Sequence, residues 1–245
     1  MPSPMPKLRR PLLALVLAAI PSLPCGLGPR EGHAAPAAAA SSSASSRAAA
    51  SAAPSSKVGK VLARARLEVE RGVVYDPAYK VTTFRDGVDT GKAVYPGGDV
   101  QPTRGVCTDV VVRSLRAVGF DLQRLVHEAA AAHAAWFPTI QTPDANIDHR
   151  RVPGLMAYFD HAAKRLATST ADAADRASFE PGDLVIWSFD ACPKCSPRHI
   201  GVVSDRRGPR GLPLVIHNLG PHPTEDDSLD AWTMLRHYRV SGAVE

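Results

Sequence analysis

The chain has 245 residues, of which 44% are hydrophobic and 22% charged, a composition typical of a globular protein. A purely disordered or fibrous chain is therefore excluded, and 22 prolines and 18 glycines argue against a coiled coil. Most of the net charge of +5 lies near the front, so the remainder is too weakly basic for us to expect a nucleic-acid partner.

The front of the chain has the layout of a secretory signal peptide. A positively charged start is followed by an apolar stretch from Leu12 to Ile20 and by small residues around Ala34 and Ala35. The apolar stretch is about half as long as the ~20 residues needed to span a bilayer. We expect residues 1–35 to be a cleaved signal peptide, and the product to be periplasmic without stable membrane insertion.

Residues 36–56 contain only Ala, Ser and Pro apart from Arg47. Such a segment cannot bury enough apolar surface to offset the entropy lost on ordering, so it predicts a disordered spacer. The folded part is then one domain over residues 57–245, large enough for a real core.

The first half of this domain predicts helices. Apolar residues at 58, 62, 65 and 69 recur at helical spacing, and Gly72 is a plausible stop. Residues 75–105 carry turn signals and predict irregular structure. Apolar residues at 107, 111, 115 and 118 fall on one face of a second helix that ends at Gly119, and further helices are predicted over residues 122–135 and 153–166.

After Gly182 the pattern changes to short runs rich in β-branched residues. These runs are residues 183–187, 200–203 and 214–216, with a final strand around 237–240. Helices followed by consecutive strands predict an α+β domain with an antiparallel sheet.

Cys107 stands at the start of its predicted helix, where unpaired N–H groups and the helix dipole favour a thiolate. Judged alone, a cysteine in this position is more commonly a buried structural residue than a nucleophile. If it is a nucleophile, we expect a neighbouring imidazolium to lower the pKa of Cys107 below the ordinary value of ~8.5.

His199 and His217 flank a predicted turn at residues 207–211. A hairpin centred near residue 208 would make the two histidines direct cross-strand neighbours, whereas a one-residue shift would bring Asn218 to that face. Because no third metal ligand is evident, we expect no metal and no cofactor. The prediction is that His199 acts as a base for the Cys107 thiol and that His217 orients it.

Three other features are candidates for roles near the site. Asp148, His149 and Arg150 belong to a polar cluster before a helix. This cluster is either a substrate-recognition loop, in which an arginine binds a carboxylate of a peptide, or an ion-paired loop that holds the helix. Tyr95 and Asp109 are further candidates for substrate binding.

Cys192 and Cys195 lie three residues apart in a loop just before His199. A zinc site would need two more ligands, and a redox dithiol lacks a thioredoxin-like context. In an oxidising compartment we expect a local disulfide.

Several segments resemble motifs of known families. Those similar to NlpC-type papain-like cysteine peptidases are residues 95–99, 105–109, 181–185 and 198–203, and those similar to the exported bacterial family called domain of unknown function 1287 are residues 146–153 and 215–220. The resemblance implies a papain-like α+β fold with the cysteine helix packed on an antiparallel sheet. It also implies Cys107 as nucleophile, His199 as base and His217 as the orienting residue. One departure is Val106-Cys-Thr-Asp109, where relatives usually have Asp-Cys-Ser-Gly.

The resemblance and the residues together predict an exported thiol hydrolase that cleaves an amide bond in peptidoglycan peptides. Two alternatives stay open: a non-catalytic module of the same fold that binds the cell wall, and an acyltransferase that works through the same thioester.

Overall fold

The structure is a computed structural model that describes residues 56–243. The predicted signal peptide and all but the last residue of the predicted spacer lie outside these residues. Within them, no helix has both the length and the apolar character needed to cross a membrane.

The helices are α1 (Lys57–Glu70), α2 (Cys107–Arg116), α3 (Leu122–Ala132), α4 (Val152–Ala162) and α5 (Ala173–Ala177), with short 3-10 helices η1 (Ala134–Trp136) and η2 (Asp148–Arg150). The strands are β1 (Val74–Tyr75), β2 (Phe84–Arg85), β3 (Val88–Asp89), β4 (Arg104–Gly105), β5 (Lys164–Arg165), β6 (Leu184–Ser188), β7 (His199–Arg207), β8 (Pro213–His217), β9 (Thr224–Asp226) and β10 (Thr233–Arg239).

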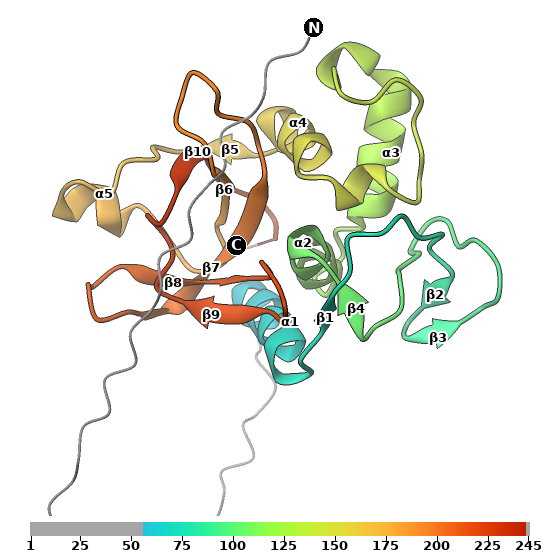
Figure 1. The fold of residues 1–245 in the computed structure, drawn as a ribbon, viewed down its shortest axis with the longest axis horizontal. Coiled ribbons are helices and arrows are strands. Elements are labelled where there is room, and N and C mark those ends of the chain that lie inside the picture. Colours follow the sequence, from blue (N-terminus) through green and yellow to red (C-terminus); the bar gives the residue numbers. More distant parts are fainter. Residues whose placement is uncertain (1–55, 244–245) are drawn as a thin grey trace, which may run out of the picture. The chain divides into compact units, whose positions relative to one another are not determined.

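Six of the strands form one antiparallel sheet in the order β5-β10-β6-β7-β8-β9. All five residues of β6 are buried, because this strand lies between β10 and β7 with both of its faces covered. Figure 1 shows the sheet on one side of α2, and α3 with the β2–β3 hairpin on the other. The α+β class and the antiparallel sheet predicted from the sequence are confirmed.

One face of the sheet carries the main hydrophobic core. Val111 and Leu115 of α2 belong to the same buried cluster as Ile200 and Val202 of β7, and α1 adds Leu62 beside α2. Fully burying a side chain of this size contributes about 1.5–3 kcal/mol. The apolar stripe read from the sequence of α2 is the surface that fixes this helix, and hence Cys107, against the sheet.

The opposite face is also buried, under the segment that follows β9. Val185, Trp187, Val203 and Val215 form a second cluster there with Leu229. Trp187 donates its indole N–H to the Leu229 carbonyl at 3.0 Å, which fixes the covering segment to the sheet. The histidines described below lie among the aromatic residues of this side.

Of two predicted helix ends, one is confirmed and the other is wrong. α1 ends next to Gly72, whose φ of +57° suits a helix stop, so the predicted end is confirmed. The helix predicted over residues 153–166 ends instead at Ala162. The residues that follow form β5, in which Arg165 pairs with Tyr238 of β10, because the sheet edge offers hydrogen bonds that compete with another helical turn.

Candidate active site

Cys107 is the first residue of α2, and its side chain is only 6% exposed. The start of the helix is fixed by Asp109, whose carboxylate accepts the backbone N–H of Val106 at 2.7 Å. Gly105 makes this contact possible, since a Cβ there would lie 3.0 Å from the Cβ of Asp109. The position of the thiol is thus set by the residues immediately around it.

A buried ion pair anchors the same turn to the rest of the domain. Arg150 donates from Nε and Nη2 to the two carboxylate oxygens of Asp109, at 2.8 and 3.0 Å. Thr108 adds a hydrogen bond from Oγ1 to the carbonyl of Arg150 at 2.9 Å. Burial opposes ionisation of Asp109, but its bonds to Arg150 outweigh burial and keep its pKa below the ordinary value. These contacts hold η2 against the start of α2.

Opposing effects act on the pKa of the Cys107 thiol. Burial raises its pKa to about 12, although the backbone N–H groups of Ile200, Thr108 and Cys107 itself lower it. The expectation of a lowered pKa is therefore wrong for this structure. The helix dipole contributes only about 0.3–1 kcal/mol, too little to offset the loss of water around the sulfur.

The two predicted histidines meet, and they extend into a longer polar chain. His199 Nε2 lies 2.8 Å from His217 Nδ1, and His217 Nε2 lies 3.1 Å from Asp226 Oδ1 and 3.0 Å from Ser228 Oγ. The bond to His217 holds the pKa of Asp226 well below its usual range, so this carboxylate accepts a hydrogen bond. His217 therefore donates from Nε2, accepts at Nδ1, and leaves His199 with its proton on Nε2.

This tautomer has a chemical consequence. The Nδ1 of His199 is left without a proton, as a base requires. Burial lowers the pKa of His199 to about 3, and His217 adds to this effect. At neutral pH the imidazole and the thiol are thus both uncharged.

Aromatic rings enclose the base. The rings of Trp187 and Trp232 each lie with their centroids 5.6 Å from that of His199, and Phe189 follows at 5.9 Å. The sulfur of Cys107 reaches the same strand, where it accepts the backbone N–H of Ile200, the residue after His199. Among the described residues no hydrogen bond joins the sulfur to His199. Such bonds are often long in free enzymes and tighten when substrate binds.

The hairpin between the histidines has a different register from the predicted one. Val202 pairs with Ile216 and Val203 with Val215, which places His217 opposite Gly201 rather than His199. The cause is the position of the turn, which lies between the paired residues Arg207 and Pro213 and is therefore centred near residue 210. The irregularity between Val203 and Arg207 offsets part of this displacement. A shift of two residues leaves each side chain on its predicted face, so the histidines still meet, as diagonal neighbours.

Gly201 and Asn218 explain why His217 is the residue that reaches the base. A Cβ on Gly201 would lie 3.2 Å from the Cβ of His217, so the glycine leaves room for the imidazole. Asn218 accepts the N–H of Gly220 and approaches the carbonyl of Gly105. Among the described residues no hydrogen bond joins Asn218 to His199.

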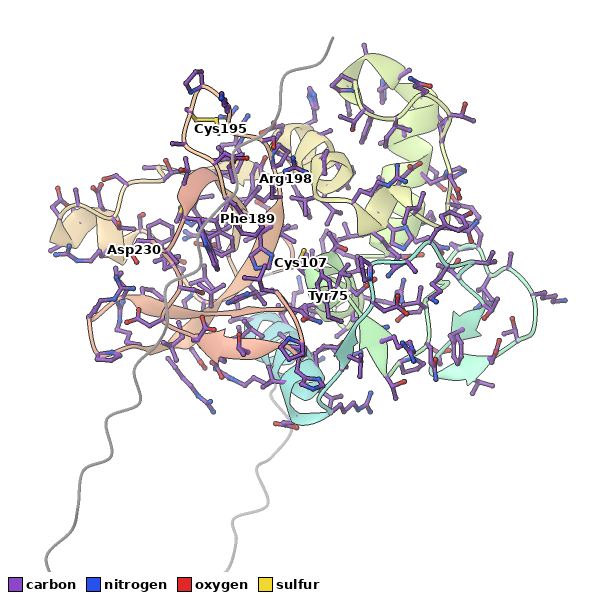
Figure 2. All side chains as sticks on the ribbon, in the orientation of Figure 1. Tyr75, Cys107, Phe189, Cys195, Arg198 and Asp230 are labelled. Carbon is purple, nitrogen blue, oxygen red and sulfur yellow. A yellow bond between two sulfur atoms is a disulfide. The ribbon has the colours of Figure 1, made fainter. Side chains whose placement is uncertain are left out.

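The thiol opens on a pocket of about 230 Å³. Its lining includes Tyr75, Arg150, Arg151 and Arg198, and Figure 2 shows Cys107 between Tyr75 and Arg198. Arg150 is the predicted substrate-binding residue that lines it, with its guanidinium bound to Asp109. That binding role stays a prediction.

The other substrate-binding candidates lie elsewhere. Tyr95 does not line the pocket; it is 42% exposed and meets the ring of His127 edge-on, with centroids 5.2 Å apart. Asp148 and His149 are buried, and Asp148 accepts the backbone N–H of Asp144. The burial of Asp148 and His149 and the ion pair of Arg150 favour a structural role for these three residues.

Cys192 and Cys195 are joined by a disulfide in the loop between β6 and β7 (Figure 2). The bridge closes a small loop shortly before His199. No group of three or more His, Cys, Asp or Glu side chains between residues 56 and 243 is arranged to hold a metal ion.

Sequence reasoning missed Asp226 and Ser228. Strand β9, which carries Asp226, has only three residues and no apolar alternation, so no periodicity could reveal it. Its pairing with β8, through Thr224 opposite His217, brings the carboxylate to the imidazole. Arg198 was also missed, although its position next to His199 was a usable signal.

The buried histidines predict a loss of stability in mild acid. The pKa of His199 is lowered to about 3 and that of His149 to about 4, both mainly by burial, against ~6.5 in an unfolded chain. As pH falls below 6.5, these histidines bind protons in the unfolded chain but stay neutral in the folded one. We therefore expect the free energy of unfolding to be lower at pH 5 than at pH 7 by about 2 kcal/mol per histidine. Urea unfolding at pH 7 and pH 5 measures this, and His149→Gln should remove about half of the difference. Equal stability at the two pH values would contradict the burial of neutral imidazoles.

Two known proteins are similar to this chain. A protein of Escherichia coli (strain K12) described as "Uncharacterized protein YijF" is 43% identical over 178 residues, which cover 71% of this chain and 78% of the relative. A solved structure from Staphylococcus aureus subsp. aureus Mu50, described as similar to a lipoprotein of the NLP/P60 family, is 13% identical with a TM-score of 0.37. It covers 75% of this chain, which spans 41% of that structure. Residues 62–240 match the family described as Domain of unknown function (DUF1287), and the chain belongs to this family.

Proposed function

We propose that the domain is a thiol hydrolase that cleaves an amide bond, and that its substrates are peptides of peptidoglycan in the periplasm. The observation that supports this most is the hydrogen-bonded chain from Asp226 through His217 to His199, which leaves an unprotonated imidazole nitrogen on the strand that meets Cys107. A purely structural cysteine needs no such chain, and a binding module would gain nothing from orienting a base.

The uncharged resting state decides how the thiol is activated. Burial raises the pKa of the Cys107 thiol to about 12, so the thiol is almost entirely protonated at pH 7. His199 must therefore take the proton as sulfur attacks the carbonyl carbon, by general-base catalysis. The backbone N–H of Cys107, at the start of α2, would donate to the oxygen that becomes negative.

The remaining steps follow from the same two groups. The imidazolium of His199 gives its proton to the departing amine, which breaks the carbon–nitrogen bond and leaves a thioester on Cys107. Water then attacks the thioester while His199 takes one of its protons, and the thiol and a carboxylic acid are released. An amine in place of water would give acyl transfer through the same thioester.

The test is to incubate the protein with purified muropeptides and to identify the products by mass spectrometry. We expect two fragments that together contain one added water, and no fragments with Cys107→Ala. A fragment pair that persists in Cys107→Ala, or muropeptides that stay intact with the native protein, would overturn this assignment. A transferase would instead yield peptides with exchanged amines.

A further inference from the structure

The pocket beside Cys107 has an unusual balance of charge. Arg150, Arg151 and Arg198 all line it, and no Asp or Glu is among its lining residues. Arg150 is neutralised by its buried pair with Asp109. Within the lining of this pocket, the positive charge that has no ion-pair partner therefore comes from the other two arginines.

Arg151 and Arg198 also differ from most arginines of the domain in having no partner. Between residues 56 and 243 the arginine side chains without a hydrogen bond or ion pair are those of Arg71, Arg151 and Arg198, and two of these three line the pocket. Asp144 and Asp148 lie close enough to Arg151 for its charge to favour their ionised forms, but neither forms an ion pair with it. Asp144 accepts the hydroxyl of Tyr79, and Asp148 accepts a backbone N–H. Both guanidinium groups are exposed, with all their donors free.

The two side chains come from separate elements that converge on the thiol. Arg151 is the N-cap residue of α4, directly after η2, which the Asp109–Arg150 pair holds against α2. Arg198 precedes the base, and its backbone N–H donates to the carbonyl of Trp187 at 2.9 Å. Their backbones are thus anchored to the catalytic elements while their side chains remain available.

We infer that this pocket binds a carboxylate of a peptide substrate, carried by the residue next to the scissile amide, through Arg151 and Arg198. The inference rests on the proposed hydrolase function and specifies its substrate class. A guanidinium offers a planar pair of donors that matches a carboxylate, and charge-assisted bonds of this kind are the stronger ones. At about 230 Å³ the pocket is smaller than the ~300–1,000 Å³ typical of sites for drug-sized ligands, so it holds one residue of a longer substrate.

Alkylation of Cys107 tests the carboxylate site without any substrate. Iodoacetate and iodoacetamide both form a sulfur–carbon bond and release iodide, but only iodoacetate carries a carboxylate. On the full chain at low salt, with labelling of Cys107 followed by peptide mass spectrometry, the rate ratio of iodoacetate to iodoacetamide should exceed that of glutathione about tenfold. The ratio should fall as salt is added.

The variants assign the effect to the two arginines. Arg151→Gln combined with Arg198→Gln should return the ratio to the glutathione value, and each single change should lower it in part. The matched control is Arg71→Gln, which removes the third unpartnered arginine outside the pocket and should leave the ratio unchanged. A native ratio equal to that of glutathione, or a raised ratio that survives in the double variant, would overturn the inference.

A second measurement separates this inference from the proposed function. Muropeptides with a free carboxylate beside the scissile bond should be cleaved with at least about tenfold higher kcat/KM than their amidated forms, and the double variant should lose this preference. If both forms are cleaved equally, the hydrolase assignment stands and the carboxylate site fails. If neither is cleaved while the alkylation ratio is raised, the anion site stands and the peptide substrate fails.

Discussion

Replacing His199 with alanine should lower kcat for the proposed hydrolysis by about 10²–10⁴-fold, the usual contribution of a positioned general base. The physical reason is the raised pKa of the buried Cys107 thiol, which leaves almost no thiolate at neutral pH. Without His199 no group in the described chain of hydrogen bonds can receive the thiol proton. Initial rates of amine release from muropeptides, with folding checked by urea unfolding, measure the effect.

Replacing Asp226, which binds His217, should lower kcat less than replacing His199 itself. Asp226→Asn can place an amide donor against His217 Nε2, which would reverse both imidazole tautomers and turn the base nitrogen of His199 into a donor. We expect a loss of about tenfold or more in kcat. The loss should be smaller than for His199→Ala, because Asp226 acts on the base only through its hydrogen bond to His217. Asp227→Asn is the matched control, since that carboxylate binds Arg210 instead. A loss in kcat for Asp227→Asn equal to that for Asp226→Asn would refute the tautomer argument.

Asp109→Ala should produce the largest loss of stability, about 3–5 kcal/mol in the free energy of unfolding. The change leaves the buried guanidinium of Arg150 without its bidentate partner and the N–H of Val106 without an acceptor. Urea denaturation at pH 7 measures the difference. The control is Glu128→Ala, which removes the same charge from an exposed pair with Arg124 and should cost less than about 1 kcal/mol.

A double variant separates the lost charge from the lost packing. Combining Asp109→Ala with Arg150→Met removes the unpaired buried charge, so it should recover a large part of the stability lost in the single variant. If Asp109→Ala costs no more than Glu128→Ala, the pair does not anchor the start of α2.

The elements that were predictable from the sequence are those with a long apolar period. α1 and α2 present their hydrophobic residues at helical spacing to one continuous core, so periodicity and burial give the same answer. The strands β6, β7 and β8 are short β-branched runs between turn residues, and the sheet follows from them. β5 and β9 have two and three residues, and only their neighbours in the sheet define them.

The candidate site was predictable in residue identity more than in geometry or electrostatics. His199 and His217 meet as expected, but the turn between them is centred near residue 210 rather than 208, and neither this position nor the irregularity that partly offsets it can be read from residue types. The pKa of Cys107 depends on how deeply the chain buries it, a tertiary property without a local signal. The partner of Arg150 was hidden for the same reason, since Asp109 lies 41 positions away in the sequence.

Partitioning with hydroxylamine tests most directly whether Cys107 forms a thioester with the substrate. Hydroxylamine attacks a thioester to give a hydroxamate and the free thiol, in competition with water. With the native protein and muropeptides, we predict that hydroxamate products rise with hydroxylamine concentration while Cys107→Ala forms none. Release of the amine product without hydroxamate at any hydroxylamine concentration, or equal hydroxamate formation by Cys107→Ala, would contradict the account.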